Sequence, residues 1–234
     1  SKKTAACEVF NNETSCQVTT PTITRSGYST LGYGESAGSK TSVVGNNATI
    51  TVNGNKTYYA ITSKALTANF HKNTVSSISA TSSSCTIYNM ETSCTPTLPT
   101  ITPQTNFTNN GWGTSAGQTS NGVTSITLNT SNTGSTWYAL NSRALTWNFN
   151  KNTVSSISAT SRSCTIWNTS GTCTITTPTI TPQANFTQNG FGTAAGSTSA
   201  AVAQNVSMTL NNTTTGGTYY ALNSRVLTWN FNKN

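Results

Sequence analysis

Cysteine is the residue of this chain whose spacing points most clearly to chemistry. The six cysteines fall into three pairs, and each pair follows the pattern C-x8-C. The pairs are Cys7 with Cys16, Cys85 with Cys94, and Cys164 with Cys173. A zinc site would need closer spacing and further ligands, and the only histidine is His71. We therefore predict three local disulfides, no metal, and an oxidising extracellular location.

Each predicted disulfide closes a short loop, and loop-closure entropy gives about 2.5–3 kcal/mol of stabilisation per bridge. The loops read VFNNET, IYNMET and IWNTSG. Asparagine at such a position is typical of a tight turn, so we expect a hairpin whose tip is clamped across its two strands. The cysteines are then structural staples and not redox groups.

No set of residues for catalysis recurs along the chain. With one histidine, neither a Ser/His/Asp nor a Cys/His arrangement can be repeated. The acidic residues are Glu8, Glu13, Glu35 and Glu91, and none follows Cys164. General acid–base chemistry is therefore not a property of the repeated sequence. We expect no enzyme and no cofactor.

The cysteine pairs lie in a sequence that occurs three times. Residues 72–85 read KNTVSSISATSSSC and residues 151–164 read KNTVSSISATSRSC, an offset of 151 − 72 = 79. The closing phrases are YAITSKALTANFHKN (59–73), YALNSRALTWNFNKN (138–152) and YALNSRVLTWNFNKN (220–234). Tandem copies are the signature of an array, and a unit of this size holds one small core. We predict three modules, over residues 1–73, 74–152 and 153–234.

The pattern within a copy is that of β-strands. Leu66, Ala68 and Phe70 alternate with polar residues, as a half-buried strand requires. Thr, Val, Ile and aromatic residues dominate the other ordered runs, and no helical periodicity lasts longer than about two turns. In the second copy we expect strands at 86–88, 95–102, 123–129 and 136–140, and a turn or short helical turn at 109–111. Each module is then mainly β, with at most one short helix.

Aromatic residues recur at two places. Tyr33, Trp112 and Phe191 each stand between glycines. Because the ring type varies freely, we favour packing in a core over stacking on a sugar. Trp147, with its equivalents Ala68 and Trp229, is expected to face a module core.

The net charge of +8 comes from cations that are scattered singly. This favours ordinary solubility over an anionic partner, and no nucleic acid is expected. No stretch is long and apolar enough to insert into a membrane. No signal peptide or anchor is visible, so we expect a mature form or part of a longer protein.

The order of these landmarks resembles the internalin B-repeat family, also called Listeria–Bacteroides repeats, of Gram-positive surface proteins. The matching residues are the strands LTANFHKN (66–73) and LTWNFNKN (145–152 and 227–234), the paired Gly-aromatic segment, and ATITVNGNKTYYA (48–60). The C-x8-C loop departs from the family pattern. The resemblance implies small β-grasp-like modules in a bacterial stalk or adhesin, without catalytic residues.

Two phases of the repeat remain open. Residues 65–73, 144–152 and 226–234 either close their own modules or open the next ones. We favour a non-enzymatic stalk or adhesin spacer of the cell surface. One alternative is a fibre subunit in which Leu227, Trp229 and Phe231 are donated to another copy as a strand. The other is a multivalent module for anionic glycans or teichoic acid of the host or cell wall.

Overall fold

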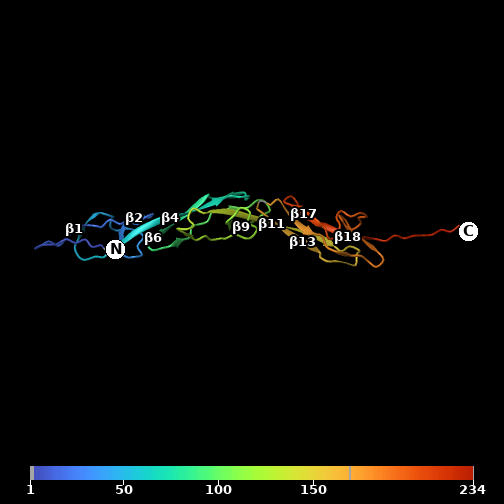
Figure 1. Cartoon of the computed structure of the whole chain (residues 1–234), viewed down its shortest axis with the longest axis horizontal. Coiled ribbons are helices and arrows are strands. Elements are labelled where there is room, and N and C mark those ends of the chain that lie inside the picture. Colours follow the sequence, from blue (N-terminus) through green and yellow to red (C-terminus); the bar gives the residue numbers. More distant parts are fainter. Residues whose placement is uncertain (1–2, 169, 234) are drawn as a thin grey trace. The chain divides into compact units, whose positions relative to one another are not determined.

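The computed structural model describes residues 3–168 and 170–233, and strands are its regular elements (Figure 1). The prediction of a mainly β chain is confirmed. Within the described residues there is no helix. The short helical turn expected at 109–111 is wrong, because these residues lie inside a strand, Thr108–Gly113. Of the strand expected at 123–129, only Leu128–Asn129 forms one.

The chain forms two compact units whose sequences interleave. The first unit contains residues 1–71, 78–100 and 123–137, and the second contains residues 72–77, 101–122 and 138–234. These bounds differ from those of the three sequence repeats, and the division into three modules stays a prediction. The interleaving follows from two long strands, each of which finds its partners both before and after it in the sequence.

The first unit is organised around the long strand β4. Its strands are β1 (Cys16–Thr19), β2 (Ser29–Gly34), β3 (Thr49–Val52), β4 (Tyr59–His71), β6 (Ser82–Tyr88), β7 (Ser93–Cys94) and β10 (Leu128–Asn129). The first half of β4 pairs with β2 and the second half with β6, both antiparallel. Two small antiparallel pairs, β1 with β3 and β7 with β10, complete the unit.

The second unit repeats this plan around β11. Its strands are β8 (Ile101–Thr102), β9 (Thr108–Gly113), β11 (Thr136–Asn150), β12 (Ser156–Ile157), β13 (Ser161–Trp167), β14 (Thr172–Thr176), β15 (Ile180–Thr181), β16 (Thr187–Gly192), β17 (Ser207–Asn211) and β18 (Thr218–Ser224). Two strands, β5 (Ser77–Ile78) and β11, cross the division between the units in sequence. β11 pairs first with β9 and then with β13. β18 runs parallel to the end of β11 and antiparallel to β16, while β12 pairs with β15 and β14 with β17.

The core of the second unit lies between these paired strands. Leu145 and Phe149 of β11 pack with Ile166, Phe191 and Leu210, all of them buried. The rings of Phe149 and Phe191 meet edge to face with their centroids 5.1 Å apart, a favourable aromatic geometry. Apolar residues two apart on β11 therefore serve as core, as their alternation in the sequence predicts.

A glycine on each side of the recurring aromatic ring allows the backbone to bulge. Gly190 has a φ of +77°, and a Cβ there would lie 2.6 Å from the carbonyl oxygen of Val202. A Cβ on Gly192 would lie 2.5 Å from that of Ser197. The pairing of β16 with β18 shifts register between Gln188 and Phe191. The two glycines thus turn Phe191 into the core, and the preference for packing over sugar stacking holds for Phe191 and for the buried Trp112.

Candidate strand-donation interface

The structure shows how one sequence repeat is joined to the next. The first half of each long strand, β4 or β11, pairs with an earlier strand of its own repeat, and the second half pairs with a strand of the following repeat. Ser63 to Asn69 of β4 pair antiparallel with β6, which comes later in the chain. Ser142 to Asn148 of β11 pair in the same way with β13. The second half of each strand therefore acts as a strand given by one repeat to its successor.

The register of this pairing is the same in both cases. Leu66 lies opposite Cys85, and Leu145 lies opposite Cys164. Both leucines are buried, as are Ala68, Phe70 and Phe149. Because the side-chain period of a strand is two, a slip by one residue would expose all of them. The leucine and the two residues at alternate positions after it therefore fix the register.

A second partner holds the opposite edge of the given strand. Asn148, Phe149 and Asn150 of β11 pair parallel with Thr218, Tyr219 and Tyr220 of β18. In the first unit, Thr67 accepts a backbone hydrogen bond from Gly134 (2.7 Å) and Asn69 donates one to Ser135 (3.0 Å). The strand is thus central in its sheet, with backbone hydrogen bonds on both sides.

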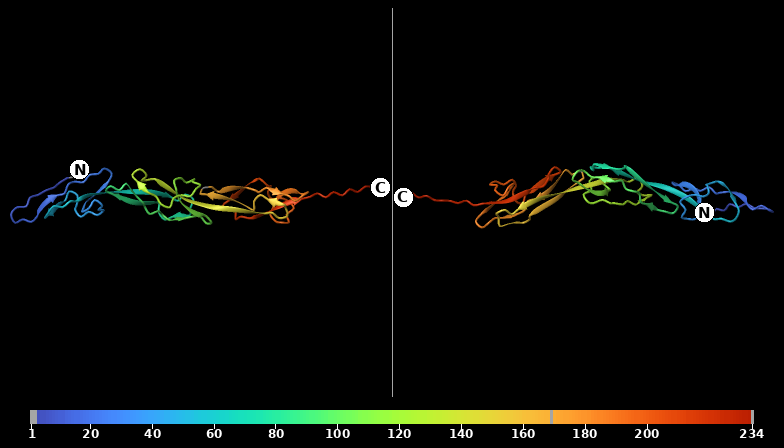
Figure 2. Two further views of the ribbon diagram at one scale, coloured as in Figure 1. Left: turned by 90° about the horizontal axis from the view of Figure 1, so that it is seen from below. Right: turned by 180° about the vertical axis from the view of Figure 1, so that it is seen from behind.

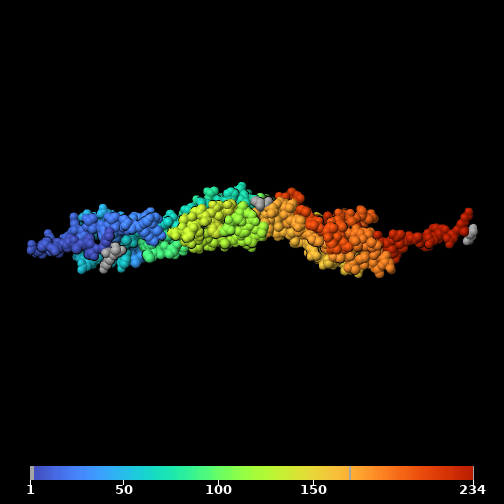
Figure 3. All heavy atoms as spheres, in the orientation of Figure 1, coloured from blue at the N-terminus to red at the C-terminus, as the bar shows by residue number. Residues whose placement is uncertain are grey.

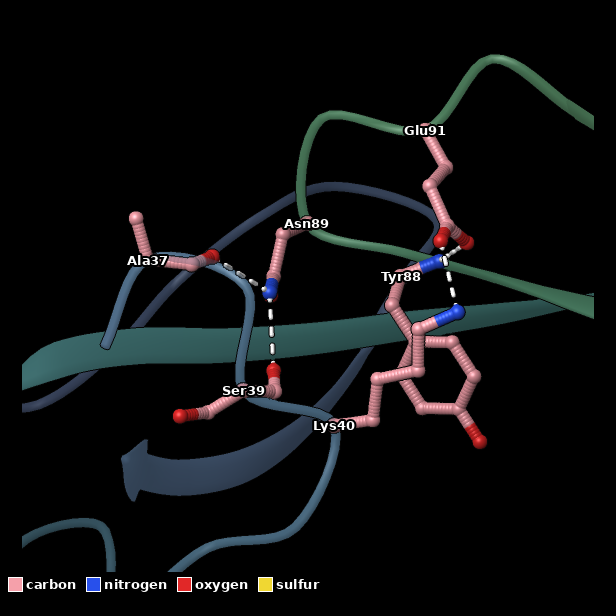
Figure 4. A network of polar contacts seen from close by, with 6 residues as sticks. All are labelled: Ala37, Ser39, Lys40, Tyr88, Asn89 and Glu91. Atoms are coloured by element: carbon pink, nitrogen blue, oxygen red, sulfur yellow. Dashed lines mark hydrogen bonds and ion pairs between the residues drawn. The ribbon is translucent and has the colours of Figure 1, made fainter. Parts of the chain in front are cut away.

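An asparagine at the tip of the cysteine loop fastens the joint. The backbone N–H of Asn89 donates to the carbonyl oxygen of Thr62 (2.9 Å), and its Oδ1 accepts from the N–H of Thr62 (3.1 Å). Its Nδ2 donates to the carbonyl oxygens of Ala37 (3.2 Å) and Ser39 (3.0 Å), as Figure 4 shows. Asn89 has a φ of 50°, in the left-handed region that asparagine tolerates better than most residues.

The same fastening recurs in the second unit. The backbone N–H of Asn168 donates to the carbonyl oxygen of Asn141, and its Oδ1 accepts from the N–H of Asn141, at 2.9 Å each. Its Nδ2 donates to the carbonyl oxygen of Gln118. Its φ is 41°. We refer to this arrangement as the asparagine clip. Sequence reasoning treated this asparagine only as a turn residue, although its place two residues after Ile87 and Ile166 recurs in the sequence.

An ion pair stands beside the clip in the first unit (Figure 4). Lys40 Nζ lies 2.7 Å from Glu91 Oε1, and Glu91 also accepts a hydrogen bond from the N–H of Tyr88 at 2.9 Å. The hydrogen bond from Lys40 and that from Tyr88 lower the pKa of the Glu91 carboxyl. Both side chains are partly exposed, so the pair contributes little to stability.

The three disulfides join the pairs that the spacing predicts: Cys7 with Cys16, Cys85 with Cys94, and Cys164 with Cys173. The expected hairpin is wrong, however. Cys164 lies on β13, which pairs with β11, whereas Cys173 lies on β14, which pairs with β17. The bridge therefore ties two sheets together. It also holds the strand that receives Leu145 against the rest of its repeat.

The equivalent segment of the third repeat pairs with no strand among the described residues. Residues 225–233, which we call the donor segment, continue β18 but form no strand, and they extend as a bare trace in Figures 1 and 2. Leu227, Trp229 and Phe231 are 68%, 81% and 91% exposed. The equivalent residues of β11 are buried or half-buried. The expectation that Trp229 faces a core is wrong for this chain, since the side chain is 81% exposed. Whether residues 226–234 close the third module or open a following one stays a prediction. Figure 3 shows the segment standing out as a narrow row of atoms.

In the first repeat, the segment equivalent to the strands that pair with β4 and β11 is largely exposed. Residues 4–10, which we call the acceptor segment, are equivalent to β6 and β13 but form no strand. Val9 is 50% exposed, whereas its equivalents Ile87 and Ile166 are fully buried. Phe10 is 63% exposed. The first repeat thus exposes apolar side chains whose equivalents in the other repeats are buried or half-buried.

Other side chains of the first repeat are also more exposed than their equivalents in the later repeats. Ala60 is exposed, while its equivalents Ala139 and Ala221 are buried. Tyr33 is half-buried, and its hydroxyl donates to the carbonyl oxygen of Pro21 at 2.7 Å. Burial raises the pKa of the Tyr33 phenol.

No metal-binding cluster forms within the described ranges 3–168 and 170–233. They bring together no group of three or more His, Cys, Asp or Glu side chains that could hold a metal ion. These ranges also hold no helix long and apolar enough to cross a membrane.

No protein-family model matches this chain, and neither a curated protein nor a solved structure matches it.

Proposed function

We propose that this chain is a structural repeat region, a stalk or spacer, of an extracellular bacterial surface protein, in which each repeat completes the next by giving it a strand. One observation carries the proposal. The second half of β11 occupies the centre of the sheet formed by the following repeat, with β13 on one side and β18 on the other. Successive repeats then share a core, and the array resists separation.

The extracellular part of the proposal rests on the disulfides. Three bridges in a chain of 234 residues are typical of an oxidising compartment. The resemblance to the internalin B-repeat family supports a place on a bacterial surface. We extend it to tandem β modules of a surface protein only, because a β-grasp module also needs a helix and the described residues form none.

Glycan binding finds less support. The recurring rings Trp112 and Phe191 are buried, so they offer no face to a sugar. The large aromatic side chains that are exposed, Phe10, Tyr59, Trp229 and Phe231, lie where a strand is missing or is offered. Their exposure is better explained by an unfilled strand position than by a ligand platform.

Hydrogen exchange on the whole chain tests the proposal. Leu145→Asp places a charge in the shared core, so amides of β13 and β14 should exchange at least tenfold faster. Amides of β2 and β6 should keep their protection. Thr146→Asp is the matched control, because it adds the same charge on the exposed face of the same strand. Full protection of β13 in Leu145→Asp would show that the given strand is not needed, and the proposal would fail.

A further inference from the structure

The donor segment and the acceptor segment match the two sides of a strand pairing, here called the joint, that occurs twice within the chain. We infer that residues 225–233 of one copy insert into the first repeat of a second copy, so that copies associate head to tail. The inference rests on the proposed function, because it assigns a partner to the same strand. The evidence is that the chain contains two filled examples of this joint, in β4 with β6 and in β11 with β13.

The sequences of the two halves match those of the filled joints. Residues 227–234 are identical to residues 145–152, LTWNFNKN. The acceptor segment ends in Cys7-Glu8-Val9-Phe10, where the filled joints have CTIY and CTIW. Ala6 replaces Ser84, so the hydroxyl contact that Thr67 makes with Ser84 (2.8 Å) has no counterpart. The apolar residues that set the register in the filled joint, Leu145, Trp147 and Phe149, have identical counterparts in Leu227, Trp229 and Phe231.

The filled joints predict the register between copies. Leu227 should lie opposite Cys7 of the second copy, as Leu145 lies opposite Cys164. Phe231 should lie beside Tyr58, as Phe149 lies beside Tyr219. This arrangement covers Val9 and Tyr33 of the second copy. It buries the exposed apolar side chains of both segments at once.

The acceptor is already shaped for this contact. The N–H of Phe10 donates to Glu13 Oε2 (3.1 Å) and the N–H of Glu13 donates to the carbonyl oxygen of Phe10 (3.0 Å). Tyr88 and Glu91 make the same two bonds in the filled joint. Asn11 has a φ of 53°, close to that of Asn89. A preformed turn lowers the ordering cost of association.

Asn11 then supplies the asparagine clip between copies. Its equivalents Asn89 and Asn168 bind the backbone of Thr62 and Asn141. The matching residue of the donating copy is Asn223, one residue before the end of β18. The joint is heterologous, since the donor and the acceptor are different surfaces. It therefore leads to an open fibre or a closed ring rather than to a symmetric dimer.

Two single substitutions separate the halves of the joint. Leu227→Asp removes the donor and leaves the acceptor, whereas Val9→Asp removes the acceptor and leaves the donor. Wild-type chains should form a concentration-dependent series of oligomers in sedimentation velocity, and each variant alone should be monomeric. An equimolar mixture of the two variants should give a discrete dimer, because only one productive joint remains.

Matched controls keep the result specific. Thr228→Asp carries the same charge on the other face of the donor segment, and Glu8→Gln changes the exposed face of the acceptor; both should still associate. Asn11→Ala should weaken association about tenfold or more, because it removes the clip. Circular dichroism should show all variants folded, since the altered residues are exposed in the free chain.

Several outcomes would overturn the inference. One is a wild-type chain that stays monomeric at the highest concentration, as expected if the donor segment serves only a following repeat of the same chain. Another is a mixture of Leu227→Asp and Val9→Asp chains that forms no dimer. A third is equal loss of association in Thr228→Asp. None of these results bears on the Leu145→Asp exchange experiment, so the proposed function is tested separately.

Discussion

Single residues of β11 differ in how much of the shared core they fill. Phe149 is buried between Phe191 and Tyr219, with ring centroids at 5.1 and 6.3 Å. Trp147 is half-buried at the edge of the core and packs on Tyr219 with centroids 5.1 Å apart. Its indole N–H finds no hydrogen-bond partner within the described part of the chain. The larger side chain is therefore not the more stabilising one.

Alanine substitutions at these two positions should rank accordingly. Phe149→Ala should lower the free energy of unfolding by about 3–5 kcal/mol, because it leaves a cavity in a closed core. Trp147→Ala should cost about 2–3 kcal/mol, because part of the ring is exposed and its N–H is unpaired. Urea denaturation followed by circular dichroism measures both values. A Trp147→Ala chain less stable than Phe149→Ala would contradict this ranking.

Among the strands, the bulge in β16 depends on its glycine. Gly190→Ala combines a positive φ with a contact of 2.6 Å to a backbone oxygen, so the strand cannot accept it without shifting. We expect a loss of about 2–4 kcal/mol in the free energy of unfolding. Gly196→Ala in the same unit is the control, because a Cβ there meets no atom within 4 Å. Equal melting temperatures for the two variants would show that the bulge is not constrained.

For the whole molecule, stability and association should respond differently to the last nine residues. Deleting residues 226–234 removes the exposed side chains of Val226, Leu227, Trp229 and Phe231. The melting temperature of the dilute chain should therefore stay within about one degree, while association should be lost. A thermal scan at low concentration and sedimentation at high concentration separate the two effects. A truncated chain that loses its third repeat would show that the segment folds back on its own repeat.

Much of this protein follows from its sequence alone. Six cysteines in three C-x8-C pairs identify the disulfide pairs, because a local pair in each copy leaves little choice of partner. Alternation in Leu145, Trp147 and Phe149 identifies a strand with an apolar face, because the side-chain period of a strand is two. The unmatched apolar face of Leu227, Trp229 and Phe231 is also visible in the sequence, and it led to strand donation as one alternative.

The tertiary structure decided which elements those strands pair with. A local pattern gives the face of a strand but not its neighbours, because backbone hydrogen bonds carry no residue identity. The two cysteines of each loop therefore looked like a hairpin, although Cys164 and Cys173 lie in different sheets. The asparagine clip could not be predicted from a local pattern either, because its partners Thr62 and Asn141 are distant in sequence. The phase of the repeat depends on such long-range pairings, and a local pattern does not specify them.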